Sequence, residues 1–317
     1  MTQLEVLQLA PRAIGSVVET HCHGCGHTQA RVLPFRYAFH GRHLEGVTCL
    51  RCTLIFVDPQ PSAEEIASMY SAEYFTESSD TVGAHGPAAY MEMAAQGNAE
   101  RAKAAHRLDR MVSKPARGRW LEVGCGPGFL LAEMQKLGWS AHGIELSEFG
   151  ARHARETLGL DVRQGEVTPG HFVRGSFDAI FLGDVLEHLP EPVATLRVLH
   201  EWLAPDGRIV IAVPATMNLA SAQLGLWLYA RRGRWKTLRI PPYHLFEYTP
   251  RTLPILLAEA GFEVRELRQS AVPLNRMGLR GSPLENAGKF ALQSLAHLTS
   301  TLFNRGGDRL LAIAAPR

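Results

Sequence analysis

Glycine occupies every second position of residues 124–128, directly after a short apolar segment. Glycine is needed where a backbone turns sharply, or where it approaches a ligand so closely that a Cβ atom would collide with it. Residues 129–137 have helical periodicity, so the sequence predicts a strand, a tight turn and a helix in succession. Dinucleotide sites use G-x-G-x-x-G, and that pattern would require a glycine where this chain has Phe129. The spacing therefore favours a ligand without a pyrophosphate.

A second strand is predicted over residues 139–145, about one βαβ unit later, and it also ends in an acidic residue, Glu145. Folds of this kind place a carboxylate at this point to bind ribose hydroxyls. From residue 120 onward, predicted strands and helices alternate, as a parallel sheet with crossover helices requires. The sequence therefore predicts an α/β fold with its ligand at the carboxyl ends of the first two strands.

With these features, the chain resembles the class I S-adenosylmethionine-dependent methyltransferases. The resemblance spans roughly residues 118–270, about half of the chain. Five segments carry it, in the family's order: 122–128, 145–147, 177–188, 203–208 and 260–262. The resemblance implies a Rossmann-like sheet of seven strands, the last antiparallel, with helices on both faces. The residues that it implies for S-adenosylmethionine binding are Glu122, Gly124, Cys125, Gly126, Gly128, Glu145, Leu146 and Glu166. Two alternatives for Glu122 stay open, because it can reach the methionine ammonium or be held by backbone amides.

Four of the five cysteines form two C-x2-C pairs, and 23 residues separate the pairs. Each pair can supply two thiolates from one tight turn, and two such turns complete a closed tetrahedral zinc site. The predicted structural zinc ligands are Cys22, Cys25, Cys49 and Cys52. Residues 31–39 and 54–57 are the expected strands of a small zinc ribbon. The alternative is a set of four reduced thiols, and the sequence does not decide whether the ribbon docks on the second domain or binds substrate.

Composition limits the classes of partner. The net charge of +2 does not indicate a broad nucleic-acid-binding surface, and 46% apolar residues in a chain of 317 suffice for one large and one small domain. No signal peptide is apparent, and no window reaches the ~18 apolar residues of a membrane span. Cysteines that are paired to bind a metal are typical of a reducing compartment. The expected location is the cytoplasm. The sequence does not indicate the oligomeric state.

We expect a zinc ribbon at residues 1–58, a helical linker with a cofactor-covering helix at 59–117, and a methyltransferase domain at 118–317. In the linker, Tyr70, Tyr74 and Tyr90 are candidates to touch the cofactor, with ordinary packing as the alternative for each. Two insertions are expected, at about 217–242 and 282–304. The first joins an apolar stretch to five basic residues between 224 and 239, which is typical either of a solvated face or of a contact with phosphate or an anionic membrane surface.

The candidate catalytic residues are Asp184, Glu187 and His188, at the end of the fourth strand of the predicted methyltransferase sheet, and the distant His244. An imidazole titrates near neutral pH, so His188 is the first candidate for a general base and His244 the second. The same set resembles the acid-x-x-Glu-His motif and later histidine that hold magnesium in small-RNA 3′-terminal 2′-O-methyltransferases. Ubiquinone-pathway O-methyltransferases have a similar Glu-His pair. Magnesium is therefore a further expectation, with Asp184 standing where a glutamate is usual.

The sequence thus predicts a methyltransferase that acts by in-line displacement on a hydroxyl of a small molecule or glycan precursor. The glycan part rests on a resemblance to bacterial methyltransferases of sugar and surface-polysaccharide biosynthesis, which carry a ribbon ahead of this domain. One alternative is a metal-assisted RNA methyltransferase, which the near-neutral charge disfavours. Another is a non-catalytic zinc-ribbon scaffold, which the glycine turn and Glu145 disfavour.

Overall fold

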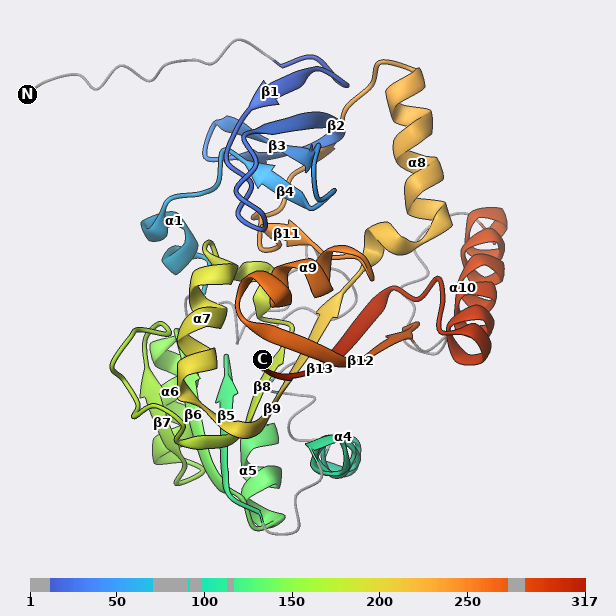
Figure 1. Ribbon diagram of the computed structural model, residues 1–317. Coiled ribbons are helices and arrows are strands. Elements are labelled where there is room, and N and C mark those ends of the chain that lie inside the picture. The colour runs from blue at the N-terminus through green and yellow to red at the C-terminus, as the bar shows by residue number, and fades with distance from the viewer. Residues whose placement is uncertain (1–11, 71–90, 92–97, 113–116, 273–282) are drawn as a thin grey trace, which may run out of the picture.

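A computed structural model describes residues 12–70, 91, 98–112, 117–272 and 283–317, and it contains two sheets (Figure 1). The larger sheet has seven strands in the order β12-β13-β9-β8-β5-β6-β7. Its strands are β5 (Arg119–Val123), β6 (Ser140–Glu145), β7 (Asp161–Gln164), β8 (Phe177–Gly183), β9 (Leu203–Pro214), β12 (Phe262–Ser270) and β13 (Arg309–Pro316). Only β13 is antiparallel to its neighbours. The predicted α/β fold with an antiparallel last strand is confirmed.

Helices cover both faces of this sheet because neighbouring strand residues point to opposite sides. Trp120 belongs to the buried core beneath α4 (Asn98–Val112), α5 (Phe129–Lys136) and α6 (Glu148–Glu156). Leu121 belongs to the core beneath α7 (Pro192–Trp202) and α9 (Thr252–Glu259). The carboxyl ends of the parallel strands therefore remain the place where loops from both layers meet.

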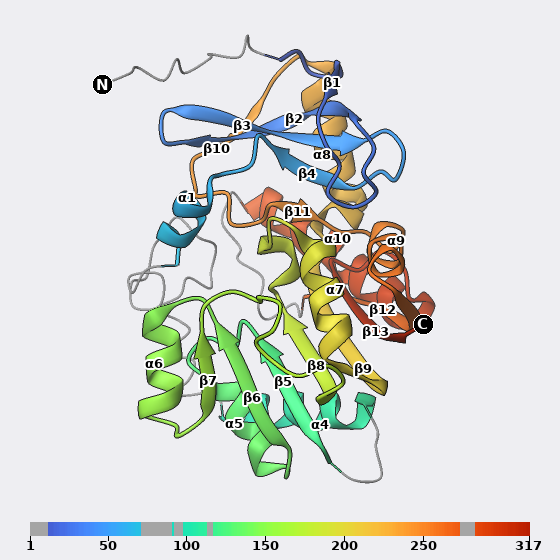
Figure 2. The ribbon, with the colours of Figure 1, turned by 60° about the vertical axis from the view of Figure 1, so that its left-hand side comes forward.

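The smaller sheet, called here the ribbon sheet, has six strands in the path β1-β2-β3-β4-β11, with β10 paired to β2. Its strands are β1 (Val17–Glu19), β2 (Gln29–Phe39), β3 (Arg42–Cys49), β4 (Ile55–Asp58), β10 (Lys236–Leu238) and β11 (Phe246–Glu247). Figures 1 and 2 show the ribbon sheet above the ends toward which the parallel strands point. The helix α1 (Ala63–Ser68) descends from it, and Ser62 and Glu65 form a capping box at its start.

The strands β10 and β11 come from the first predicted insertion and the segment after it, about 200 residues from their partners in the chain. β10 runs parallel to β2, with Thr237 opposite Arg36, and β11 runs antiparallel to β4, with Phe246 opposite Phe56. Neither strand is predicted by the sequence. Three-residue and two-residue strands carry no periodicity of their own, so only the partner strand defines them.

The rest of the first insertion forms the short 3-10 helix η2 (Thr216–Asn218) and α8 (Ala220–Arg231), which packs beside β2. The second insertion forms α10 (Pro283–Phe303), which packs against the edge strand β12. The helix predicted within the linker is described from residue 98 onward, as α4, and it packs on α5 and β9. None of the helices in the described ranges is long and apolar enough to cross a membrane.

Candidate active site

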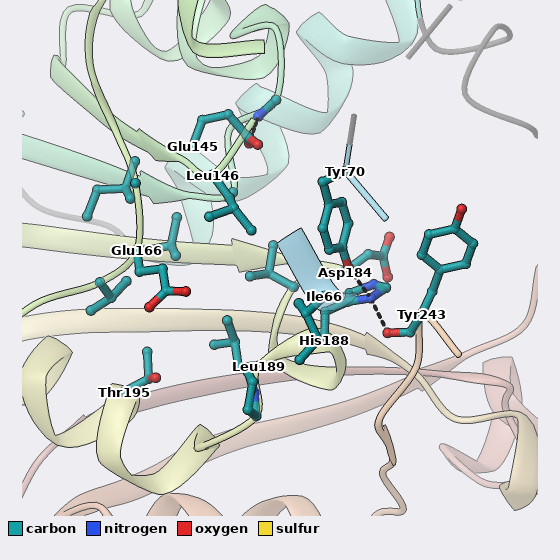
Figure 3. Close-up of a pocket in the computed structure, with 18 of the residues that line it drawn as sticks. Ile66, Tyr70, Glu145, Leu146, Glu166, Asp184, His188, Leu189, Thr195 and Tyr243 are labelled. Atoms are coloured by element: carbon teal, nitrogen blue, oxygen red, sulfur yellow. Dashed lines mark hydrogen bonds between the residues drawn. The ribbon is translucent and has the colours of Figure 1, made fainter. Parts of the chain in front are cut away.

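A cavity of about 620 Å³ lies where the parallel strands end beneath the ribbon sheet. Its lining includes the glycine turn after β5, the end of β6, the loop after β7, the end of β8 and helix α1. Figure 3 shows Glu145 and Glu166 toward one end and Tyr70, His188 and Tyr243 toward the other. A single cavity thus connects the predicted cofactor residues with the predicted catalytic histidines.

The glycine turn has the left-handed backbone that its sequence predicts. Gly124, Gly126 and Gly128 have φ values of +67°, +54° and +86°. The amides of Gly124 and Cys125 donate to the carbonyl of Ile144 on β6, at 2.8 and 3.2 Å, and so fix the turn to the neighbouring strand. A residue with a Cβ atom is strained at such φ values, so glycine is required.

The three glycines differ in what lies beside them. Gly124 and Gly126 line the cavity. A Cβ on Gly128 would instead lie 2.6 Å from Leu160 and 2.9 Å from Ala154, so this glycine allows helix α6 to pack closely. Cys125 is also buried, away from the cavity.

Glu145 and Glu122, the carboxylates at the ends of β6 and β5, have different surroundings. Glu145 accepts hydrogen bonds from the amides of Gly126 and Ser147, at 2.7 and 2.8 Å, and it lines the cavity together with Leu146. Glu122 is buried behind it, and its Oε2 has no hydrogen-bond partner. Burial, and then the nearby Glu145, raise the pKa of Glu122 to about 8. A buried acceptor without a partner is costly, and a cationic group in the turn would satisfy it.

The predicted catalytic residues lie around the 3-10 helix η1 (Leu186–His188). His188 Nδ1 is 2.6 Å from the carbonyl oxygen of Tyr243 and 2.9 Å from the hydroxyl of Tyr70. A carbonyl only accepts hydrogen bonds, so Nδ1 carries the proton and Nε2 carries the lone pair. Burial, and then the neighbouring His244, lower the pKa of His188 to about 3, so the imidazole is neutral. The ring centres of the two histidines are 5.0 Å apart.

Glu187 lies beneath these histidines and is fully buried. Neither of its carboxyl oxygens has a hydrogen-bond partner, and Oε1 is 3.5 Å from His188 Nε2. Burial, followed by the nearby Asp184, raises the pKa of Glu187 well above its ordinary value. One ligand atom from each of Glu187, His188 and His244 lies within 4.8 Å of the others. This spacing suits a single cation held by one oxygen and two nitrogens.

Asp184 has a different partner. Its backbone is left-handed, with φ at +55°, and its side chain lines the cavity but is bonded by Arg309 of β13. Glu166 lines the cavity from the exposed loop after β7. Tyr70 is the one linker tyrosine within the described residues, because Tyr74 and Tyr90 lie outside them. The carbonyl of Tyr243 could not be predicted from the sequence, because a backbone acceptor leaves no signal in side-chain patterns.

The four ribbon cysteines form a second cluster. Cys22 Sγ is 3.6 Å from Cys52 Sγ, and Cys25 Sγ is 3.7 Å from Cys49 Sγ. Four sulfurs placed ~2.3 Å from one zinc ion in a tetrahedron are about 3.8 Å apart, so the cluster has the dimensions of a zinc site. Burial raises the pKa of the Cys25 thiol to about 11, a shift that a bound cation would reverse. The fifth cysteine, Cys125, lies outside the cluster.

Comparison with known proteins identifies the family. The model of the methyltransferase domain family matches residues 95–267, more than half of the chain. This protein belongs to the methyltransferase domain family. The methyltransferase family that the sequence predicts is thereby confirmed.

Several relatives of this methyltransferase have curated names. It is 29% identical to the ubiquinone biosynthesis O-methyltransferase of Xanthomonas axonopodis pv. citri over 161 residues, which are 49% of this chain and 66% of that protein. It is 31% identical to the enzyme of the same name from Nitrosococcus oceani over 160 residues, 47% of this chain and 65% of that protein. The methyltransferase thus spans just under two thirds of the length of these relatives. A solved S-adenosylmethionine-dependent methyltransferase from Archaeoglobus fulgidus is 19% identical, covers 71% of this chain and 99% of its own, and superposes with a TM-score of 0.47.

The residues of the cavity fit the methyl donor of this methyltransferase. Gly124 and Gly126 expose backbone to the cavity beside β5, where an amino-acid moiety can enter, although a Cβ on Gly124 would itself lie 2.4 Å from Val185. The unpaired Oε2 of Glu122 suits an ammonium group, and each oxygen of Glu145 has a lone pair left for a ribose hydroxyl. When bound, S-adenosylmethionine supplies a methyl group that is already activated on a sulfonium.

Proposed function

We propose that this methyltransferase transfers a methyl group to a hydroxyl of a small molecule or glycan precursor. The observation that carries the proposal is the shared cavity, which has the glycine turn and Glu145 at one end and the neutral His188 at the other. Relatives named as ubiquinone biosynthesis O-methyltransferases support oxygen as the acceptor atom. The resemblance to sugar-modifying enzymes with a ribbon supports the glycan alternative.

In this proposal, Glu145 binds the ribose hydroxyls and Glu166 the adenine amine of the donor. Glu122 accepts from its ammonium group, and Leu146 packs against its base. The backbone at Gly124, Cys125 and Gly126 leaves room for the methionine end, and Gly128 acts indirectly, by letting α6 approach the turn. Gly124, Gly126, Glu145, Leu146 and Glu166 line the cavity in this order from β5 to the loop after β7, and this order supports their assignments. Glu122, Cys125 and Gly128 are not among the lining residues.

His188 is the proposed general base. The Tyr243 carbonyl holds the proton on Nδ1, so the lone pair of Nε2 remains to take the acceptor's proton as the new bond forms. The lowered pKa makes His188 a weak base, but an oxygen that is being methylated becomes acidic enough to give its proton to it. Ile66, Tyr70 and Leu189 line the same end of the cavity and exclude water from an acceptor beside His188. The methyl donor needs no further activation. In-line displacement therefore depends on holding the acceptor oxygen, the methyl group and the sulfur in line and on excluding water.

A second mechanism, assisted by a metal ion, is favoured by Glu187. A fully buried carboxyl group with two unpaired oxygens beside two imidazoles is the environment that a divalent cation stabilises. A metal held by Glu187, His188 and His244 would lower the pKa of an acceptor hydroxyl. Magnesium prefers oxygen ligands, and Asp184, the further oxygen donor predicted, is bonded to Arg309. One carboxylate with two histidines suits manganese, iron or zinc better.

Labelled methyl transfer tests the proposed reaction. We expect transfer from [methyl-14C] S-adenosylmethionine to a phenol or a sugar in an acceptor screen, with the label on oxygen by NMR. His188→Asn should slow transfer about 100-fold or more, because general-base catalysis contributes about 10²–10⁴-fold, while donor affinity stays within twofold. His106→Asn, on the exposed surface of α4, is the matched control and should keep full activity. Label on carbon or nitrogen would contradict O-methylation.

The same preparation separates the two mechanisms. A metal-assisted reaction requires a second metal in addition to that of the four cysteines, measured by atomic emission. His244→Ala should remove that second metal and leave the first. Full activity with only one metal per chain would assign the chemistry to His188 alone.

We also propose that Cys22, Cys25, Cys49 and Cys52 bind one structural zinc ion. The sulfur spacing and the lack of an open coordination position support a structural rather than a catalytic metal. Thiolates kept reduced for a metal suit a cytoplasmic enzyme, which is the location we propose.

Residues 224–239 are our proposed contact with a membrane surface. Thirteen large apolar side chains are exposed among the described residues, and ten of them lie on α8 and α10: Leu224, Trp227, Leu228, Tyr229, Phe290, Leu292, Leu295, Leu298, Leu302 and Phe303. No acidic residue occurs between Asp206 and Glu247, whereas five basic residues lie between 231 and 239. Apolar side chains beside basic ones are the pattern that binds an anionic bilayer peripherally.

Sedimentation with lipid vesicles tests this contact. We expect binding to vesicles containing 30% phosphatidylglycerol and at least tenfold weaker binding to pure phosphatidylcholine vesicles. The double variant Trp227→Ser, Arg231→Ser should lose most of the binding, and Arg174→Ser, at an exposed position between β7 and β8, should not. Equal binding to both kinds of vesicle would contradict the electrostatic part of the proposal.

A further inference from the structure

The ribbon sheet is continuous with the active site. Segment 243–248, called here the bridging segment, leaves the cavity at Tyr243 and His244 and then joins the ribbon sheet as β11. Phe246 pairs with Phe56 of β4, and the amide of Val57 donates to the carbonyl of Leu245 at 3.0 Å. The bridging segment is therefore held along one edge by the ribbon.

Its other edge holds the catalytic helix η1 through three hydrogen bonds. The amide of Leu245 donates to the carbonyl of Glu187 at 2.8 Å, and the hydroxyl of Tyr248 donates to the carbonyl of Leu186 at 3.2 Å. His188 Nδ1 bonds the Tyr243 carbonyl. Each residue of η1 thus takes its position from the bridging segment.

The four-cysteine cluster holds β4 in turn. The amide of Cys49 donates to the carbonyl of Leu54, and the amide of Thr53 donates to the carbonyl of Cys49, at 2.9 and 3.1 Å. His23, between Cys22 and Cys25, contacts the rings of Phe56 and Phe246 edge-on, with ring centres 5.9 and 5.6 Å apart. One buried apolar core runs through Cys22, Cys49, Cys52, Leu54, Phe56, Leu245, Phe246, Tyr248 and Leu186 without a break.

The cofactor end has a separate support. The glycine turn is fixed by the carbonyl of Ile144 and by Glu145, both on β6, and these bonds involve no ribbon residue. The hydrogen bonds at the two ends of the cavity therefore come from different parts of the fold, although Val123 and Ile144 at the donor end belong to the same buried core as the ribbon residues.

We propose that the four-cysteine ribbon is a positioning element of the active site. With zinc bound, it holds the bridging segment, and through that segment it sets η1 and the imidazole of His188 against the acceptor. Loss of the zinc loosens the catalytic end of the cavity and leaves the donor end formed. This inference rests on the proposed zinc ligands. A small ribbon takes much of its folding free energy from its metal, so the coupling is strong.

Hydrogen exchange of the full chain tests the proposal. The amide of Leu245 reports the contact with η1, and the amide of Gly124 reports the donor end. On removal of zinc by a chelator, we expect exchange at Leu245 to accelerate tenfold or more, with exchange at Gly124 and the affinity for S-adenosylhomocysteine changing less than twofold. Protection of Leu245 that survives zinc loss would overturn the proposal. A protein that binds no zinc at the cysteines would instead contradict the assigned ligands.

A second experiment keeps the metal in place and covers the case in which the zinc-free chain unfolds throughout. Phe56→Ala removes the ring that packs on His23 and Phe246, and it should accelerate exchange at Leu245 with zinc still bound. Phe56→Leu should restore most of the protection. The matched control is Phe177→Ala, which leaves a cavity in the same buried core. Phe177 begins β8, whereas η1 follows the other end of that strand. Equal acceleration at Leu245 in both alanine variants would show a general loss of stability and overturn the positioning role.

Discussion

Gly126→Arg should abolish binding of S-adenosylmethionine while the chain still folds. Gly126 lines the cavity with φ at +54°, and its amide is bonded to Glu145. An arginine there places a side chain in the proposed donor space and a cation beside Glu145, the carboxylate that we propose binds the ribose. We expect the affinity to fall by 100-fold or more, which is about 2.8 kcal/mol. Titration calorimetry measures the affinity, and circular dichroism checks the fold.

Gly170→Arg is the matched control. Gly170 also has a left-handed backbone, with φ at +83°, but nothing lies within 4 Å of a Cβ placed there, and it does not line the cavity. The backbone strain is of the same kind, about 1–2 kcal/mol, so the control separates strain from obstruction of the donor site. Unchanged donor affinity in Gly126→Arg would remove the glycine turn from the proposed site.

Cys49→Ser should lower the zinc content and the melting temperature together. Cys49 is buried, and its sulfur lies 3.7 Å from that of Cys25. Serine is a poor zinc ligand, so the ribbon loses folding free energy that the metal supplies. A loss of about 3 kcal/mol would lower the melting temperature of a chain of this size by about 5–10 °C. Atomic emission and calorimetry measure the two quantities.

Cys125→Ser provides the comparison for this prediction. Cys125 is as buried as Cys49 but lies outside the sulfur cluster, within the glycine turn. We expect its zinc content to match that of the unaltered protein, with a loss of stability from the polar hydroxyl alone. A full complement of zinc in Cys49→Ser would show that the assigned ligand set is wrong.

The donor end of the cavity could be predicted from short stretches of sequence. The glycine turn and Glu145 each follow a strand that local periodicity reveals, and parallel strands end at one edge of their sheet, so the two features had to meet. Gly128 shows the limit of this reasoning. It has the same spacing as Gly124 and Gly126, yet it faces Leu160 and Ala154 on the far side of the turn.

The acceptor end could be predicted only in part. Asp184, Glu187 and His188 were expected to cluster with His244, and Glu187 and the two histidines do lie together. Asp184 faces Arg309, a residue 125 positions later, and no local pattern indicates that pairing. The Tyr243 carbonyl that fixes the tautomer of His188 is a backbone group, which sequence patterns do not describe.

The sequence by itself determined the alternation of strands and helices, the glycine turn and the two cysteine pairs, because each of these patterns lies within residues a few positions apart. Only the tertiary structure decided that residues 236–247 complete the ribbon sheet and connect it to η1, the helix that carries the proposed catalytic residues. Those strands, two and three residues long, gain their hydrogen bonds from partners about 200 residues away, so their conformation is fixed by packing rather than by their own side chains.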